Sequence, residues 1–165
     1  MSSELWAINA SPLIALARVG QLALLELPGR QLLVPKAVVK EVRAGAELDP
    51  ARVAIERGFG GTAVAVTPQL EVLEWGLGTG ESAVLTLARL RGAVAVIDDG
   101  EARSAARALG VRLIGTLGVV LLARQEGRIA SASQTLRTLR QAGFYLDDNL
   151  LREALARTVG ESWEP

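Results

Sequence analysis

Two adjacent carboxylates, Asp98 and Asp99, directly follow a short apolar run at 93–97. That run contains only small and branched apolar residues, which is typical of a strand buried on both faces of a parallel sheet. A helix is expected to begin immediately afterwards, over 101–109. The two acids would then lie at the carboxyl edge of the sheet, where open α/β folds place their chemistry.

This acid pair has two interpretations. Asp98 and Glu101 have the spacing of a capping box, and acids are favoured at a helix N-terminus. One cap is sufficient, however, and a second carboxylate beside a buried strand is costly unless a cation compensates its charge. The pair therefore predicts a metal-binding edge, with helix capping as the simpler alternative.

Four other polar side chains are candidates for the same site, each with a structural alternative. Glu81 follows the glycine-rich loop 76–80 and would occupy the first turn of a helix, where an acid is favoured in any case. Asn9 ends the first expected strand and can offer a neutral carbonyl oxygen to a cation. Ser11 is expected to cap the next helix. Glu41 borders the apolar stripe of its helix, and its spacing does not distinguish it from other glutamates.

The chain contains no histidine and no cysteine. This composition excludes Ser-His-Asp triads, imidazole metal sites, thiolate zinc sites, cysteine nucleophiles and disulfides. A site built only from carboxylates and other oxygen donors favours hard cations such as Mg²⁺ or Mn²⁺.

The charges balance, with 18 Lys and Arg against 18 Asp and Glu, so any nucleic-acid contact requires a local basic patch. One candidate RNA-binding patch lies within 116–141, where a single acid, Glu126, accompanies four arginines: Arg124, Arg128, Arg137 and Arg140. Ordinary solvated helix surface is the alternative interpretation of these arginines.

The order of the expected elements indicates a single α/β domain over 1–165, with a parallel sheet between helix layers. Strands are expected at 5–8, 31–34, 63–66, 93–97 and 112–114. Helices are expected at 11–20, 35–45, 49–57, 67–75, 81–90, 101–109, 116–125, 133–141 and 148–158. No apolar run reaches the length of a membrane span and no basic run precedes the first strand, so a cytoplasmic location is expected.

The chain resembles a PIN domain, of the branch labelled domain of unknown function 3368 (DUF3368), whose relatives include VapC-like toxin ribonucleases. The resemblance rests on an ordered set of short motifs that spans nearly the whole sequence: Asn9-Ala10-Ser11-Pro12, Val34-Pro35 with Glu41, Gly80-Glu81-Ser82, Asp98-Asp99 with Ala102-Arg103, and Gly115-Thr116-Leu117-Gly118.

This resemblance implies a three-layer α/β/α fold with a five-stranded parallel sheet of order 3-2-1-4-5, on which the C-terminal helices from about 133 pack. It also implies a ribonuclease site that uses Mg²⁺ or Mn²⁺. The four positions carried over to this chain are Asn9, Glu41, Glu81 and Asp99, with Asp98 as the neighbour most easily confused with Asp99. All five are included in the metal-binding set, with the four acids as catalytic residues and Ser11 and Thr116 as supporting hydroxyls. The implied partners are an RNA substrate, a small antitoxin protein and a second copy in a homodimer.

Asn9 is a departure from the usual pattern, because PIN nucleases generally have aspartate at this position, although asparagine is frequent in this branch. The alternative function is therefore a catalytically weak or inactive PIN-like module that binds RNA or a partner protein. A phosphatase with an aspartyl nucleophile and a response-regulator receiver are both disfavoured, because each needs an acid directly after the first strand.

Overall fold

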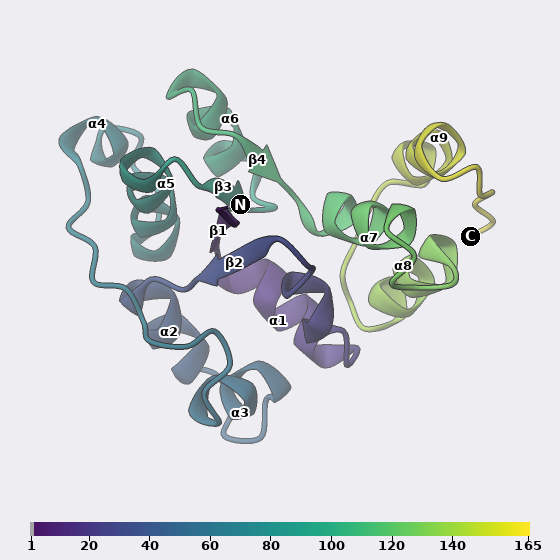
Figure 1. Cartoon of the computed structure of the whole chain (residues 1–165), viewed down its shortest axis with the longest axis horizontal. Coiled ribbons are helices and arrows are strands. Elements are labelled where there is room, and N and C mark those ends of the chain that lie inside the picture. The colour runs from purple at the N-terminus through teal and green to yellow at the C-terminus, as the bar shows by residue number, and fades with distance from the viewer. Residues whose placement is uncertain (1) are drawn as a thin grey trace.

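The computed structural model describes residues 2–165, in which helices surround a parallel sheet (Figure 1). The elements in chain order are β1 (Glu4–Ile8), α1 (Ala10–Arg18), the 3₁₀ turn η1 (Leu22–Leu25), β2 (Arg30–Leu33), α2 (Lys36–Arg43), α3 (Pro50–Glu56), α4 (Leu70–Leu73), α5 (Thr79–Arg91), β3 (Val94–Val96), α6 (Gly100–Ala108), β4 (Leu113–Ile114), α7 (Thr116–Gln125), α8 (Ala132–Gln141) and α9 (Asp148–Thr158). Among these helices, none is both long enough and apolar enough to cross a membrane.

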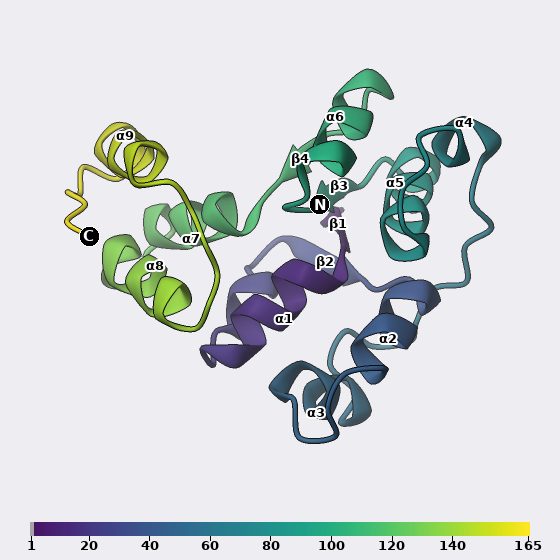
Figure 2. The same cartoon turned by 180° about the vertical axis from the view of Figure 1, so that it is seen from behind.

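The sheet within residues 2–165 has four parallel strands in the order β2-β1-β3-β4. Its centre is apolar, since Trp6, Ala7 and Ile8 of β1 and all of β3 are buried. Such burial on both faces requires covering helices, because parallel strands are joined by helical crossovers. In both views α5 lies on one side of the strands and α7 on the other (Figures 1 and 2). The predicted α/β fold with a parallel sheet flanked by helices is therefore confirmed.

The prediction of five strands was wrong. The segment 63–66 forms only an isolated bridge between Val64 and Pro35. Two backbone hydrogen bonds flank it, from Lys36 to Val64 at 2.8 Å and from Val64 to Val34 at 2.9 Å. Pro35 has no N–H to donate, and α2 begins at the next residue, so the ladder has nothing further to pair with. The other four predicted strands are present and keep their predicted neighbours.

Several predicted helix starts were also displaced. The helix expected at 67–75 is reduced to α4, because the backbone N–H of Gln69 is held by the Thr86 hydroxyl at 3.1 Å and Gln69 is extended. Asn9, and not Ser11, occupies the N-cap position of α1. Helix α5 begins at Thr79, two residues before the expected start.

The C-terminal helices α7, α8 and α9 lie together, on the side of the molecule away from α4 and α5 (Figure 1). Helix α7 contacts both α8 and α9, and it also contacts η1 and β4. The chain after α9 folds back onto this group through Trp163, whose ring is buried and whose Nε1 donates to Asp148 at 2.9 Å. The segment between α8 and α9 thereby reaches the carboxyl edge of the sheet.

Candidate functional site

Asp98 lies beyond the carboxyl end of β3 and joins it to the start of α7. One of its oxygens accepts a hydrogen bond from the backbone N–H of Thr116 at 2.7 Å, and the other accepts from the Thr116 hydroxyl at 2.6 Å. Thr116 is fully buried. The carboxylate is therefore held in one orientation by two donors, and it keeps lone pairs for a further partner.

Asp99 has a different task from Asp98. Its side chain is the N-cap of α6 and accepts from the backbone N–H of Ala102 at 2.9 Å. The predicted capping box of Asp98 with Glu101 was wrong, because α6 begins at Gly100, one residue earlier than expected. The structural alternative thus applies to Asp99, and Asp98 has no part in capping α6.

Glu41 extends from α2 to the first turn of α5. Its Oε1 accepts a hydrogen bond from the backbone N–H of Gly80 at 3.0 Å. The partial positive charge of a helix N-terminus favours an acid in this place. Glu41 also lines a cavity of about 430 Å³, together with Ser11 and Phe144. This contact distinguishes Glu41 from the other glutamates, which spacing alone did not.

Glu81 lies on the first turn of the same helix. Its Oε2 accepts from the backbone N–H of Gly78 at 2.8 Å, which closes the helix start from the other side. Glu41 and Glu81 therefore both contact the N-terminus of α5. Across residues 2–165, no three acids lie close enough to hold one metal ion together.

Asn9 has the most unusual environment of the predicted site residues. Its backbone N–H donates to Val96 on the neighbouring strand at 3.0 Å, so it lies at the carboxyl edge between β1 and β3. The residue is only 4% exposed. Within the described part of the chain its Oδ1 has no hydrogen-bond partner, and it makes no capping bond to α1. An unsatisfied buried carbonyl oxygen costs about 1–3 kcal/mol, so we expect this oxygen to accept a hydrogen bond or to contact a cation.

Arg103 is a further polar residue of the edge, on α6. Its Nη1 donates to the backbone carbonyl of Ile97 at 3.1 Å. Burial lowers the pKa of Arg103, Arg107 acts in the same direction, and Asp98 opposes both. A Cβ added to Gly115 would lie 2.9 Å from both Arg103 Nη1 and Asp98 Oδ1, so the cation and the acid converge at this glycine.

A second cavity, of about 520 Å³, is lined by Asp98, Arg103 and several apolar side chains. Phe144, in the segment between α8 and α9, lines both this cavity and the one beside Glu41. The edge of the sheet therefore has two hollows around one aromatic ring. Of the predicted hydroxyl supports, Thr116 holds Asp98, whereas Ser11 lines the hollow of Glu41.

The four C-terminal arginines do not form one free basic surface. Arg124 pairs with Glu161 at 3.2 Å, and Arg137 donates to the Glu164 carbonyl at 3.2 Å and lies over the Trp163 ring. Arg140 pairs with Asp148 and also lies over Trp163. Arg128 is exposed. Three of the four thus stabilise the C-terminal helices, which favours the structural interpretation of these residues.

Three residues of this edge were not singled out as candidates from the sequence. Gly80 and Arg103 belong to the motifs of the family resemblance but had no predicted role, and no role was predicted for Phe144. Glycine directly before an acid at a helix start was the available signal for Gly80. No sequence signal connected Phe144 to the edge, because its position depends on how α8 and α9 pack.

Gly80→Ala is expected to destabilise the fold and displace Glu41. A Cβ at this position would collide with Oε1 of Glu41 and lie 3.0 Å from its Cδ. Glu41 is exposed and its carboxylate can turn away, so the cost is the loss of its hydrogen bond to Gly80, and we expect Gly80→Ala to be less stable than Gly100→Ala by about 1 kcal/mol. Gly100→Ala is the matched control, because Gly100 also lies on a first helical turn and its added Cβ would meet no atom within 4 Å. Thermal unfolding measures both, and equal melting temperatures for the two variants would contradict the packing described.

Comparison with known proteins gives one clear result. A search among curated proteins found no significant match. A family model described as DUF3368, a PIN domain, matches residues 5–161. This match covers nearly the whole chain, including Asn9, Asp98 and Thr116 of the sheet edge. The chain therefore belongs to the DUF3368 family of PIN domains.

Proposed function

We propose that this protein is a metal-dependent ribonuclease of the PIN type, with its site at the carboxyl edge of β1 and β3. Membership of a PIN domain family supports a nuclease-like fold. The observation that carries the proposal is the oxygen of Asn9, which is buried and lacks a hydrogen-bond donor among residues 2–165. It lies at the strand end next to the one that leads into Asp98.

The donor chemistry fits a divalent cation such as Mg²⁺ or Mn²⁺. Asn9 offers a carbonyl oxygen, and Asp98 offers carboxylate lone pairs beyond its two bonds to Thr116. Hydrated Mg²⁺ keeps several waters and is usually held by one or two carboxylates together with substrate phosphates, so a cage of three acids is not required. Asn9 and Asp98 are the proposed direct ligands. Glu41, Glu81 and Asp99 are the other acids of the proposed site.

A bound divalent cation supplies Lewis acidity and makes water nucleophilic at neutral pH. The chain's own residues prepare the edge for this chemistry. Thr116 fixes the orientation of Asp98, and Gly80 fixes that of Glu41. Arg103, whose charge lies beside Asp98, is placed to attract an RNA phosphate. Phe144 lines the hollows beside both Asp98 and Glu41.

Asp98→Asn is expected to reduce RNA cleavage roughly 100-fold or more, which corresponds to about 3 kcal/mol of transition-state stabilisation. Asparagine can keep a hydrogen bond to Thr116, so the fold should be retained. Cleavage of a pool of structured and single-stranded RNA would be measured with Mn²⁺ and with chelator. Glu101→Gln is the control, since it removes an exposed acid from the first turn of α6. Cleavage that survives Asp98→Asn, or that proceeds unchanged in chelator, would refute the proposal.

The alternative function is a PIN-like module that binds RNA or a partner protein without cleaving, and Asn9 favours it because one carboxylate of the usual set is missing. Binding should then survive the double change Asp98→Asn with Asp99→Asn, and wild type should not cleave. The proposal also includes a small antitoxin as inhibitor and a homodimer, which come from the resemblance to the toxin branch, and the cytoplasmic setting expected from the sequence.

A further inference from the structure

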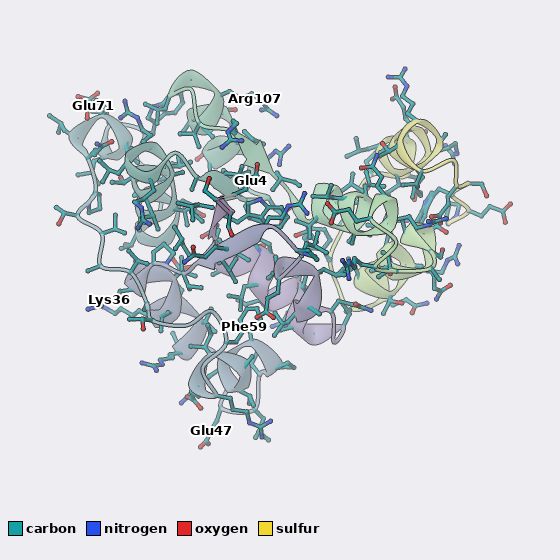
Figure 3. All side chains as sticks on the ribbon, viewed as in Figure 1. Glu4, Lys36, Glu47, Phe59, Glu71 and Arg107 are labelled. Carbon is teal, nitrogen blue, oxygen red and sulfur yellow. The ribbon has the colours of Figure 1, made fainter. Side chains whose placement is uncertain are left out.

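A cavity of about 630 Å³ lies away from the acidic edge, between α2 and the segment that follows α3. Its rim carries three cations from one face of α2: Lys36, Lys40 and Arg43. Figure 3 labels Lys36, at the start of α2, and Phe59, another residue of the lining, in the segment that follows α3. We name the three cations the α2 basic stripe.

The α2 basic stripe has no acidic partner of its own. None of the ion pairs found within residues 2–165 includes any of its three members. All three side chains are exposed. Three cations on one helix face, unpaired among residues 2–165, form a local positive surface on a molecule of zero net charge. Its occupant should therefore be an anion.

The floor of the cavity is apolar and well defined. Val34 and Ile55 are buried, and Phe59 and Val39 are partly buried. Gly60 has a φ of 83°, and an added Cβ would lie 2.6 Å from Val34, so the backbone packs directly on the floor. This close approach sets the position of the neighbouring Phe59. The occupant should therefore combine anionic groups with a flat or apolar body.

We propose that this cavity binds single-stranded RNA, with phosphates on the α2 basic stripe and a base against Phe59. The inference rests on the proposed function. Base stacking on an aromatic side chain beside a positively charged groove is the general mode of single-strand binding. The cavity beside α2 would then be a binding site for the substrate outside the acidic edge.

Continuity with the acidic edge favours RNA over an acidic peptide. Helix α2 carries both the basic stripe and Glu41. At 3.6 residues per turn, Glu41 projects about 140° around the helix from Lys36. A helix with side chains is about 10–12 Å across, so a strand that lies on the stripe needs to pass only over α2 to reach Glu41. The cavity thus lies where a substrate strand would continue beyond its cleavage point.

The test measures binding of a fluorescein-labelled 20-nucleotide RNA of mixed sequence by fluorescence anisotropy in chelator, where metal-dependent cleavage cannot occur. The triple variant Lys36→Ala, Lys40→Ala, Arg43→Ala is expected to bind roughly 100-fold more weakly at 0.1 M salt. Its plot of log K against log salt should be shallower by about 2, which corresponds to three lost phosphate contacts. Phe59→Leu should weaken binding about tenfold with an unchanged salt slope.

The matched control removes three exposed cations elsewhere, by Arg91→Ala, Arg107→Ala and Arg152→Ala. It lowers the net charge equally and should change the affinity less than about threefold. Equal weakening in both triple variants, an unchanged affinity in Phe59→Leu, or wild type that binds poly-glutamate and not RNA would each overturn the inference. Because the assay detects binding alone, a protein that binds through the stripe without cleaving would refute only the proposed nuclease. A protein that cleaves but binds equally without the stripe would refute only the inference.

Discussion

Asn9→Asp is expected to lower the melting temperature in chelator by roughly 5–15 °C and to make it strongly dependent on Mn²⁺. Asn9 is 4% exposed and its Oδ1 has no partner among the described residues. A carboxylate in this place is a buried charge without compensation, which costs several kcal/mol. For a chain of this size each kcal/mol corresponds to about 2–4 °C.

Added Mn²⁺ should restore most of that loss, because a cation that binds only the folded state stabilises it by mass action. The measurement is thermal unfolding with a series of Mn²⁺ concentrations. Asn149→Asp is the control, since it makes the same chemical change at an exposed position in α9. If Asn9→Asp and Asn149→Asp respond equally to Mn²⁺, or if Asn9→Asp unfolds like wild type in chelator, then Asn9 is not at a cation site.

Glu161→Gln is expected to destabilise the C-terminal helices by about 2–3 kcal/mol at neutral pH. Glu161 binds the start of α8 through four donors, namely the backbone N–H groups of Ala132 and Ser133, both at 3.0 Å, and the hydroxyls of Ser131 and Ser133, both at 2.9 Å. It also pairs with Arg124. Glutamine keeps the shape but loses the charge, and its amide group would face N–H donors.

The loss should depend on pH in a defined direction. Burial alone would raise the pKa of Glu161, but hydrogen bonds from the backbone of Ser133 and Ala132 and from the serine hydroxyls lower it from 4.5 to about 2. A carboxylate whose pKa is lowered by folding stabilises the protein above its unfolded pKa. The difference between wild type and Glu161→Gln should therefore be full at pH 7 and fall as the pH decreases from 4.5 towards 2.

Thermal unfolding at pH 7 and pH 3 measures this difference. Glu164→Gln is the matched control, because Glu164 is exposed and uses only its backbone carbonyl to contact Arg137. That control should unfold like wild type at both pH values. A difference between Glu161→Gln and wild type that is unchanged between pH 7 and pH 3 would contradict the role of the charge.

The sequence was sufficient for the parts of the fold that depend on local patterns. The buried run at 93–97 and the amphipathic helices were predictable, because burial and helical periodicity act over neighbouring residues. The reduction of the expected strand at 63–66 to a single bridge was not predictable, since that pairing depends on Pro35, which lies beside the segment only in the folded chain. The roles of Asp98 and Asp99 depended on a shift of one residue in the start of α6, which is below the precision of local signals.

The site was predictable in residue type and less so in arrangement. The run of acids at strand and helix ends indicated the edge, but Glu41 reaches Gly80 across 39 positions and Asp98 reaches Thr116 across 18. Contacts between residues so far apart in the sequence cannot be predicted from the spacing of residue types. The C-terminal arginines resembled a phosphate-binding patch because their partners Glu161 and Trp163 lie after the stretch 116–141 that contains the arginines.

The most direct test of the cation site is the anomalous difference density of crystals grown with Mn²⁺. We predict a peak about 2.0–2.6 Å from Oδ1 of Asn9 and from a carboxylate oxygen of at least one acid of the edge: Glu41, Glu81, Asp98 or Asp99. Mn²⁺ found only elsewhere on the protein at saturating concentration, or an ordered hydrogen-bond donor that satisfies Oδ1 of Asn9 in its place, would contradict the account.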